Sequence, residues 1–168
     1  MGWVDAACRV SVTLRNSIGG QIVGLPYPIS RPHLTMPLGY DIYPDIGLLY
    51  IRGQGTVTQR QRMSAMLAWL REPEYQNCRD AIVDLADVTT TPKVGELREL
   101  IAMLKQERPA RGPRRVAIVT SKPIAFAVAR AFVHLVRLRG LPLDVKVFMS
   151  LSHAWTWLRP DEPPFQLR

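Results

Sequence analysis

The chain has 168 residues, of which 47% are hydrophobic and 21% are charged, and its formal net charge is +8 at pH 7. This composition excludes a disordered chain. The most apolar window, residues 124–136, is shorter than the ~20 residues of a membrane-spanning helix, so we expect no transmembrane segment. Cys8 and Cys78 lie far apart in the sequence. We therefore expect no disulfide between them and a reducing, cytoplasmic location.

The positive charge is concentrated in the C-terminal part of the chain. Residues 1–107 carry 11 basic and 11 acidic side chains, whereas residues 108–168 carry 11 basic and only 3 acidic ones. Such a bias favours binding to nucleic acid or to anionic lipid headgroups. However, no basic motif interleaved with aromatic residues and no helix-turn-helix pattern accompanies it, so we expect nucleic acid not to be the partner.

Three segments are predicted along the chain. Residues 1–37 contain four prolines and no sustained periodicity, which is typical of a flexible or loosely docked extension. Residues 38–160 alternate between strand and helix patterns and form the folded domain. Residues 161–168 are predicted to be a C-terminal tail.

The strand patterns of the domain predict a hairpin followed by three further strands. Strands over residues 40–43 and 46–52 flank Pro44-Asp45, which is turn chemistry, so they should pair antiparallel. The further strands are predicted at residues 81–85, 116–119 and 145–148. Because helical patterns separate them, the sequence predicts an α/β fold with a mostly parallel sheet and about four flanking helices.

Capping residues indicate where the first two helices begin. Thr58 and Gln61 have the spacing of a capping box, and Pro73 ends the first helix. Thr91 and Pro92 predict an N-cap and a first helical position for the second helix. The buried face of the first helix is predicted from apolar residues at helical spacing: Met63, Met66, Leu67 and Leu70.

The last two helices are predicted in the same way. The third helix should run over residues 123–139, with Ser121 as its cap and Gly140 as its stop. Ser150 or Ser152 should begin the last one.

Several short segments occur at matching places in a known superfamily: Gly53 with Val57-Thr58, Ile82–Leu85, Arg115–Val119, Val147-Phe148, and Ala154 with Trp157-Leu158. Together with the order of elements, they resemble the SpoIIAA-like superfamily, in particular bacterial STAS or CRAL-TRIO-like domains. The resemblance implies a single domain with a mostly parallel sheet and an N-terminal antiparallel hairpin. It also implies a role without catalysis, as a regulatory partner-binding module or a carrier of a hydrophobic ligand.

The resemblance also allows one regulatory mechanism to be tested on the sequence. Anti-sigma-factor antagonists of this superfamily are phosphorylated on a serine at the start of the second helix. Alignment on residues 84–88 places Gly95 at the motif's glycine and Lys93 at the phosphoacceptor. Lysine is no substrate for a serine kinase, so we expect this protein to lack the classical serine switch.

Nucleotide, metal and nucleophile signatures are weak or missing in the sequence. Gly53 and Gly55 follow a strand, but Thr58 occupies the third glycine position of a dinucleotide-binding loop. The three histidines lie in unrelated segments, neither cysteine has a neighbour at ligand spacing, and no nucleophile elbow occurs. We expect no metal, no cofactor and no enzymatic activity.

Polar side chains at the predicted carboxyl ends of the strands form a candidate ligand site, because ligands of open α/β sheets bind there. Ser121 and Lys122 would hold an anion at a helix N-terminus. Alternatively, the serines cap helices and the aspartates brace loops. The candidate residues are Asp84, Asp87, Thr120, Ser121, Lys122 and Ser150.

The predicted third helix is apolar on most of its circumference. Its polar residues Arg130, His134 and Arg137 form one narrow stripe, so its apolar sides need two partners. We expect a homodimer first, or else an apolar ligand held between helix and sheet. The predicted interface residues are Phe126, Phe132, Val133 and Val136.

These patterns predict a non-catalytic regulatory or ligand-binding module whose partner is a protein or an apolar ligand. Two alternatives stay open. One is a small enzyme or a nucleotide- or anion-binding protein that uses the carboxyl ends of the strands. The other is a binder of anionic surfaces or nucleic acid through the basic C-terminal half.

Overall fold

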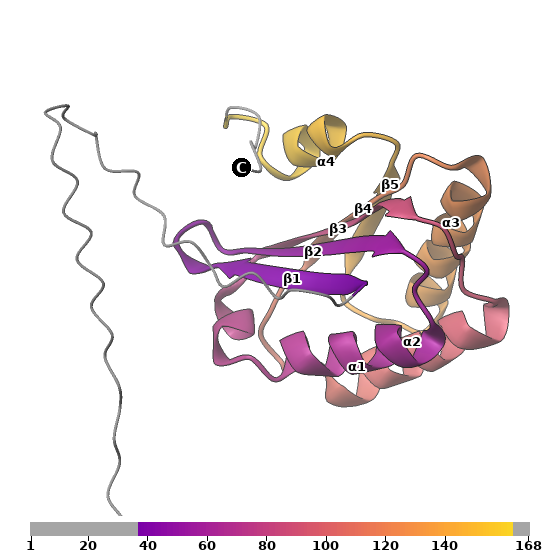
Figure 1. The fold of residues 1–168 in the computed structure, drawn as a ribbon. Helices are drawn as coiled ribbons and strands as arrows, with labels where there is room; N and C mark the ends of the chain where they lie inside the picture. The colour runs from indigo at the N-terminus through magenta and orange to yellow at the C-terminus, as the bar shows by residue number, and fades with distance from the viewer. Residues whose placement is uncertain (1–36, 163–168) are drawn as a thin grey trace, which may run out of the picture. The chain divides into compact units, whose positions relative to one another are not determined.

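The computed structural model describes residues 37–162. The predicted extension therefore lies outside the described residues except for its last residue, and so does most of the predicted tail. Five strands form one sheet in the order β1-β2-β3-β4-β5 (Figure 1). They are β1 (Leu38–Tyr43), β2 (Leu48–Gly55), β3 (Asp80–Val88), β4 (Arg115–Val119) and β5 (Asp144–Phe148).

The sheet has the predicted mixture of strand directions. β1 and β2 pair antiparallel through a short 3-10 turn at Pro44–Ile46, and every other neighbouring pair is parallel. The α/β fold with an N-terminal antiparallel hairpin is thus confirmed. β3 is longer than predicted because its pairing with β2 continues to Gly55 and Val88.

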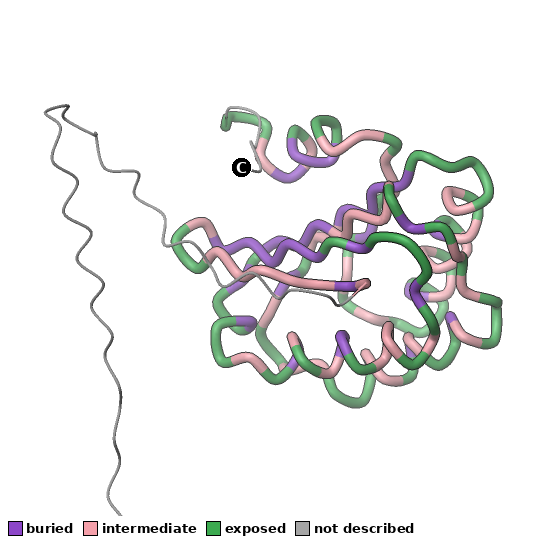
Figure 2. Tube along the Cα trace, in the orientation of Figure 1, coloured by how far each residue is buried: buried purple, intermediate pink, exposed green. Residues whose placement is uncertain are grey.

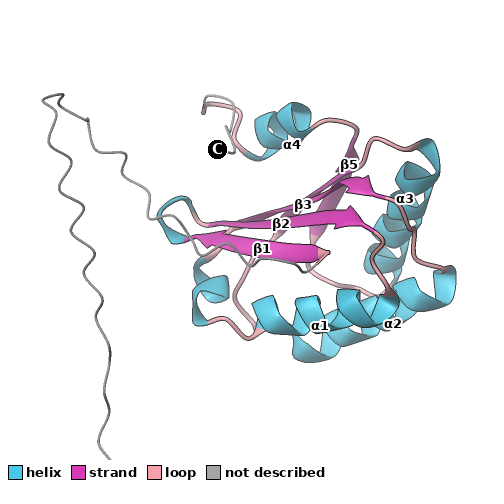
Figure 3. Ribbon diagram, in the orientation of Figure 1, coloured by secondary structure: helices cyan, strands magenta, loops and turns pink. Residues whose placement is uncertain are grey.

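Four helices flank the sheet, and they divide unequally between its two faces (Figure 3). Right-handed crossovers between strands that succeed one another in the same direction place all the connecting helices on one face. The three connecting helices accordingly share a face, whereas the C-terminal helix covers the other (Figure 1). The helices are α1 (Gln59–Leu70), α2 (Val94–Glu107), α3 (Pro123–Leu138) and α4 (Leu151–Leu158).

Alternate side chains of the strands build a separate core on each face. Leu49, Ile51 and Ala81 pack with α1 on one face. Leu48 and Ile82 point to the other face and pack beneath α4. The buried residues consequently concentrate in the middle strands (Figure 2), and an apolar cavity lies on the face of α1, α2 and α3.

The capping residues of α1 and α4 are those predicted. Thr58 and Gln61 form a capping box at α1. Ser150 accepts a hydrogen bond from the backbone N–H of His153 at 3.3 Å, and it caps α4. Gly140 follows α3 with a φ of 66°, the left-handed conformation in which a glycine commonly ends a helix.

The predicted start of α2 is wrong by two residues, whereas α3 begins at Pro123 as predicted and only its predicted cap is wrong, by one residue. α2 begins at Val94 rather than at Pro92, because the carboxylate of Glu96 accepts a hydrogen bond from Lys93 N at 2.8 Å and makes Lys93 the N-cap. Lys122, not Ser121, precedes α3, and the Ser121 hydroxyl donates to the carbonyl oxygen of Ala86 instead.

Gly53 has a packing role rather than a nucleotide-binding one. It lies in β2 where the register with β3 shifts, and a Cβ there would stand 2.6 Å from a methyl group of Val88. Gly55 ends the strand with a φ of 62°. Both glycines thus serve the close approach and the turn of the backbone.

Within residues 37–162, the helices are all too short or too polar to cross a membrane.

Candidate functional site

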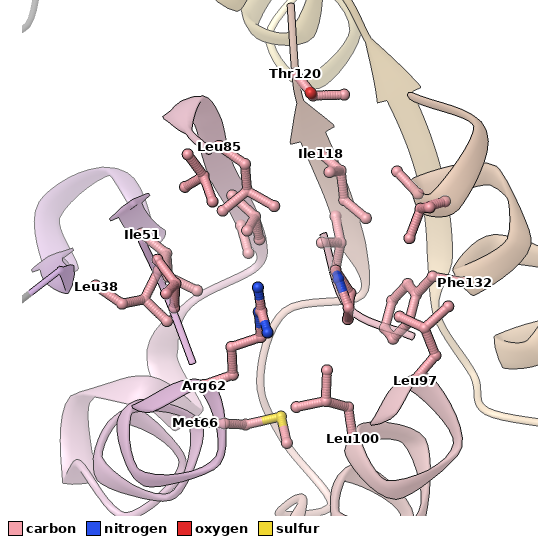
Figure 4. A pocket seen from close by; sticks show the side chains of 18 of the residues that line it. Leu38, Ile51, Arg62, Met66, Leu85, Leu97, Leu100, Ile118, Thr120 and Phe132 are labelled. Carbon is pink, nitrogen blue, oxygen red and sulfur yellow. The ribbon is translucent and has the colours of Figure 1, made fainter. Parts of the chain in front are cut away.

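A cavity of about 210 Å³ lies between the sheet and the layer formed by α1, α2 and α3. Its lining is mainly aliphatic and aromatic (Figure 4). Strands supply Leu38, Ile51 and Ile118, and helices supply Met66, Leu97 and Phe132.

The cavity exists because the three helices leave part of the sheet uncovered. The central strands of a parallel sheet are usually buried on both faces. Three residues of these strands are nevertheless only half-buried, and all three line the cavity: Val83, Leu85 and Val116. On the opposite face, Ile82 and Ala117 are 0% exposed beneath α4. One face is therefore closed and the other is hollow.

α3 presents one of its apolar sides to the cavity. Ala125, Val128, Ala129 and Phe132 line it, and their spacing of i, i+3, i+4 and i+7 places them on one stripe of the helix. The cavity thus lies against one apolar side of α3, whereas Ile124 and Leu138 on another side are exposed.

The predicted interface residues are distributed between the core and the cavity. Val136 is 0% exposed and packs near Val145, so it offers no surface to a second subunit. Phe132 and Val133 are half-buried and pack against the same cluster, and Phe126 is half-buried too.

Among residues 37–162, Arg62 is the only charged residue lining the cavity. It lies on α1 one turn before Met66, and its guanidinium extends toward the middle of the cavity (Figure 4). Nη2 donates to the Thr90 carbonyl oxygen at 3.2 Å and to the Thr90 hydroxyl at 3.3 Å. Burial away from water lowers the pKa of Arg62, while the charge of Glu96 acts in the opposite direction.

Thr120, at the end of β4, is the member of the predicted site that lines the cavity. It is 1% exposed, and its backbone N–H donates to the carbonyl oxygen of Phe148 at 3.0 Å. Its hydroxyl has no hydrogen-bond partner among the described residues. A buried hydroxyl without a partner is unusual in a native protein and calls for a ligand or water molecule.

The two predicted aspartates are engaged outside the cavity. Asp84 accepts a hydrogen bond from the Tyr50 hydroxyl at 2.9 Å and one from Ala86 N at 3.1 Å. Burial, followed by the hydrogen bond to Asp84, raises the pKa of Tyr50. Asp87 forms an ion pair with Arg52 at 3.3 Å, and both side chains are exposed.

The remaining predicted site residues contact the backbone. Ser121 Oγ donates to the carbonyl oxygen of Ala86 at 3.2 Å, and Lys122 Nζ donates to that of Val88 at 2.8 Å. Both residues thus hold the end of β3, whereas Ser150 caps α4. The structure places Ser121 and Lys122 beside the end of β3, where their side chains bind backbone carbonyl oxygens.

The sequence analysis missed the cavity and Arg62. A signal for Arg62 was present, because it lies four residues before Met66 and so on the same side of α1 as a predicted core residue. A charged residue in a buried helical stripe departs from the amphipathic pattern. The cavity itself depends on the distance between helices and sheet, which no pattern of residues reports.

The connection between β3 and α2 lies beside the cavity. Thr90, Thr91 and Pro92 line it, and among the described lining residues Thr91 alone is exposed. Within residues 37–162, no group of three His, Cys, Asp or Glu side chains could hold a metal ion.

The chain is similar to a solved structure, that of an uncharacterized protein of the DUF3478 family with a SpoIIAA-like fold from Shewanella loihica PV-4. The two are 19% identical, the match covers 72% of this chain and 91% of the other, and the TM-score is 0.45. No protein-family model and no curated protein matches the sequence.

Proposed function

We propose that the domain is a non-catalytic binding module that holds a small apolar ligand between its sheet and the layer of α1, α2 and α3. The observation that carries this proposal is the apolar cavity of about 210 Å³. Pockets that bind small molecules are concave, mainly apolar and equipped with a few polar groups that orient the ligand. Arg62 and Thr120 are such groups here.

The volume of the cavity limits the size of the ligand. An apolar cavity of roughly 150 Å³ is enough to bind benzene, whereas drug-sized ligands occupy pockets of roughly 300–1,000 Å³. The volume of about 210 Å³ lies between these cases. It suits a short aliphatic chain or one ring, or the end of a longer chain.

The exposed position of Thr91 supports entry at the β3–α2 connection. The connection comprises residues 89–93. Within it, Thr90 forms hydrogen bonds with α1 and with the β2–α1 loop. Movement of this connection would open the cavity without disturbing the strand pairing of β3.

Binding is favoured over catalysis by the way the polar edge is used. Asp84, Ser121 and Lys122 are each hydrogen-bonded to neighbouring protein groups, so they brace the end of β3 rather than face a substrate. Lys93 at the phosphoacceptor position argues against a serine switch in the regulation of this module.

Self-association through the outer surface of α3 is a second proposal, and two exposed residues favour it. Ile124 is 74% exposed and Leu138 is 80% exposed. They lie on the same side of α3, which is separate from the cavity-lining stripe. Sedimentation of the wild type and of an Ile124→Ser, Leu138→Ser variant tests this proposal, since a dimer built on this surface should dissociate in the variant.

Two alanines of α3 provide a matched test of ligand binding in the cavity. Ala125 lines the cavity, whereas Ala127 is exposed. The probe is 1-octanol, an uncharged aliphatic ligand, measured by titration calorimetry and by the melting temperature, which a ligand of the native state raises. Ala125→Leu should weaken binding several-fold because the added side chain occupies the cavity. Ala127→Leu should bind as the wild type does.

Either of two results would reject the proposal. Absence of saturable octanol binding to the wild type would show that the cavity is not a ligand site. Equal binding by both leucine variants would place the ligand elsewhere.

A further inference from the structure

We infer that the natural ligand is a monocarboxylate with an apolar chain, whose carboxylate binds Arg62 and whose chain fills the cavity. This inference rests on the proposed function and specifies the chemical class of its ligand.

The first step concerns the hydrogen-bonding capacity of Arg62. A guanidinium has five N–H donors in a fixed fork, and the hydrogen bonds of Arg62 to other described residues all use Nη2, with Thr90 as acceptor. Nε and Nη1 thus have donors to spare in a guanidinium that extends into the cavity (Figure 4). A planar carboxylate oxygen pair is the ligand group that fits such a fork best.

The positive charge of Arg62 is not balanced by an ion pair with another described residue. Among residues 37–162, no carboxylate lies within ion-pair distance of it. Glu96 is the acid that acts on it electrostatically, but the carboxylate of Glu96 accepts a hydrogen bond from Lys93 N. A partly buried cation without a paired anion is costly, so a ligand that supplies the anion is favoured over a neutral one.

A third observation separates a polar ligand from a plain hydrocarbon. Thr120 also lines the cavity, and its buried hydroxyl has no partner among the described residues. A hydrocarbon would offer no hydrogen bond to the Thr120 hydroxyl or to the Arg62 donors that Thr90 does not use. The lining therefore matches an amphipathic molecule rather than a purely apolar one.

A purely structural role is the competing explanation, because Arg62 also joins α1 to the β3–α2 connection through Thr90. The two roles differ in what they predict for two ligands of equal length. If Arg62 only supports the cavity wall, its loss lowers the affinity for charged and uncharged ligands alike. If Arg62 binds the carboxylate, its loss lowers the affinity for the charged ligand selectively.

The experiment measures the dissociation constants of octanoate and 1-octanol by calorimetry for the full chain and three variants. Arg62→Met removes the charge and keeps an apolar side chain of similar length. Arg62→Gln removes the charge but keeps a donor for Thr90, and it provides the same comparison if the methionine variant does not fold. Arg60→Met is the matched control, since Arg60 is exposed on the same helix.

The wild type should bind octanoate about tenfold more tightly than octanol, or better, because hydrogen bonds to a charged group are the strong ones. Arg62→Met and Arg62→Gln should lose this preference, because each should weaken the binding of octanoate by a larger factor than the binding of octanol. Arg60→Met should keep the preference.

Two results would overturn the assignment of Arg62: an unchanged preference for octanoate in both Arg62 variants, or an equal weakening of octanoate and octanol binding. Octanol binding by the wild type would still support the proposed function. A wild type that binds neither ligand would reject the proposed function itself, and the ligand class with it.

Discussion

Thr90 and Arg62 are joined by two hydrogen bonds from one guanidinium nitrogen, at 3.2 Å to the Thr90 carbonyl oxygen and at 3.3 Å to its hydroxyl. The same hydroxyl donates to the carbonyl oxygen of Val57 at 2.9 Å and lies 3.0 Å from Val57 N. Thr90 thus connects α1, the β2–α1 loop and the β3–α2 connection, three segments that line the cavity.

A substitution at Thr90 should therefore cost much more stability than the same substitution one residue earlier. Thr90→Val keeps the shape of the side chain but removes the hydroxyl, so it should lower the free energy of unfolding by about 1–3 kcal/mol. Thr89 is exposed, and its hydroxyl lies 3.4 Å from that of Thr56. Thr89→Val should change stability by about 0.5 kcal/mol or less. Urea denaturation measures both, and equal effects would contradict the role of Thr90.

The ion-pair cluster around Asp80, at the start of β3, should stabilise the fold strongly. Asp80 is 0% exposed, and its carboxylate binds Arg115 at 2.7 Å and Arg159 at 3.2 Å. Asp80→Asn removes the carboxylate that pairs with Arg115 and leaves Arg159 with Glu162 alone, and it should lower the free energy of unfolding by about 3–5 kcal/mol.

The exposed pair of Arg52 and Asp87 provides the control for Asp80. Asp87→Asn should change the free energy of unfolding by about 1 kcal/mol or less, because water screens this pair. Thermal denaturation of both variants would contradict the account if Asp87→Asn were the more destabilised.

Glycine-to-alanine substitutions should have opposite signs at two positions. At Gly53 the new Cβ would stand 2.6 Å from Val88, so Gly53→Ala should destabilise the domain by about 1–3 kcal/mol through overpacking. Gly95 lies in α2 with no atom within 4 Å of a new Cβ. Gly95→Ala should stabilise by about 0.5–1 kcal/mol through helix propensity. A neutral Gly53→Ala in chemical denaturation would show that β2 and β3 approach less closely.

Cys78 should be a poorly reactive thiol in the native protein. Burial, with a smaller contribution from Glu74, raises its pKa from 9.0 to about 11, and its thiol donates to the carbonyl oxygen of Glu74. Because the thiolate is the reactive form, alkylation by iodoacetamide should be slow at pH 8 and should accelerate as the pH rises toward about 11. A Cys8→Ser variant isolates this thiol, and fast alkylation of its native form at pH 8 would contradict the burial.

The sequence predicted the fold well because the fold depends on local signals. Pro44-Asp45 fixed the hairpin turn, and the capping box at Thr58 fixed the start of α1. The start of α2 was missed because a tertiary contact contributes to it. The hydroxyl of Thr90 binds the backbone of Val57, and the carboxylate of Glu96 makes Lys93 the N-cap, although Thr91-Pro92 favours an earlier start.

The candidate site was predicted only in part for the same reason. Thr120 could be placed at the carboxyl edge from the position of β4, but the partners of Asp84, Ser121 and Lys122 come from other strands and loops. The apolar surplus of α3 did indicate that more than one face of the helix needed a partner. The kind of partner that covers such a face depends on the distance between the helices and the sheet, which the sequence pattern does not report.

The central claim, that an apolar ligand occupies the cavity, is tested most directly by the fluorescence of Trp69. This side chain lines the cavity, whereas Trp155 and Trp157 pack on the opposite face with α4. A titration with 8-bromo-1-octanol, whose bromine quenches a nearby indole, should give saturable quenching of the wild type and of Trp157→Phe. Trp69→Phe should abolish it. Quenching that survives in Trp69→Phe but disappears in Trp157→Phe would place the ligand on the α4 face and contradict the account.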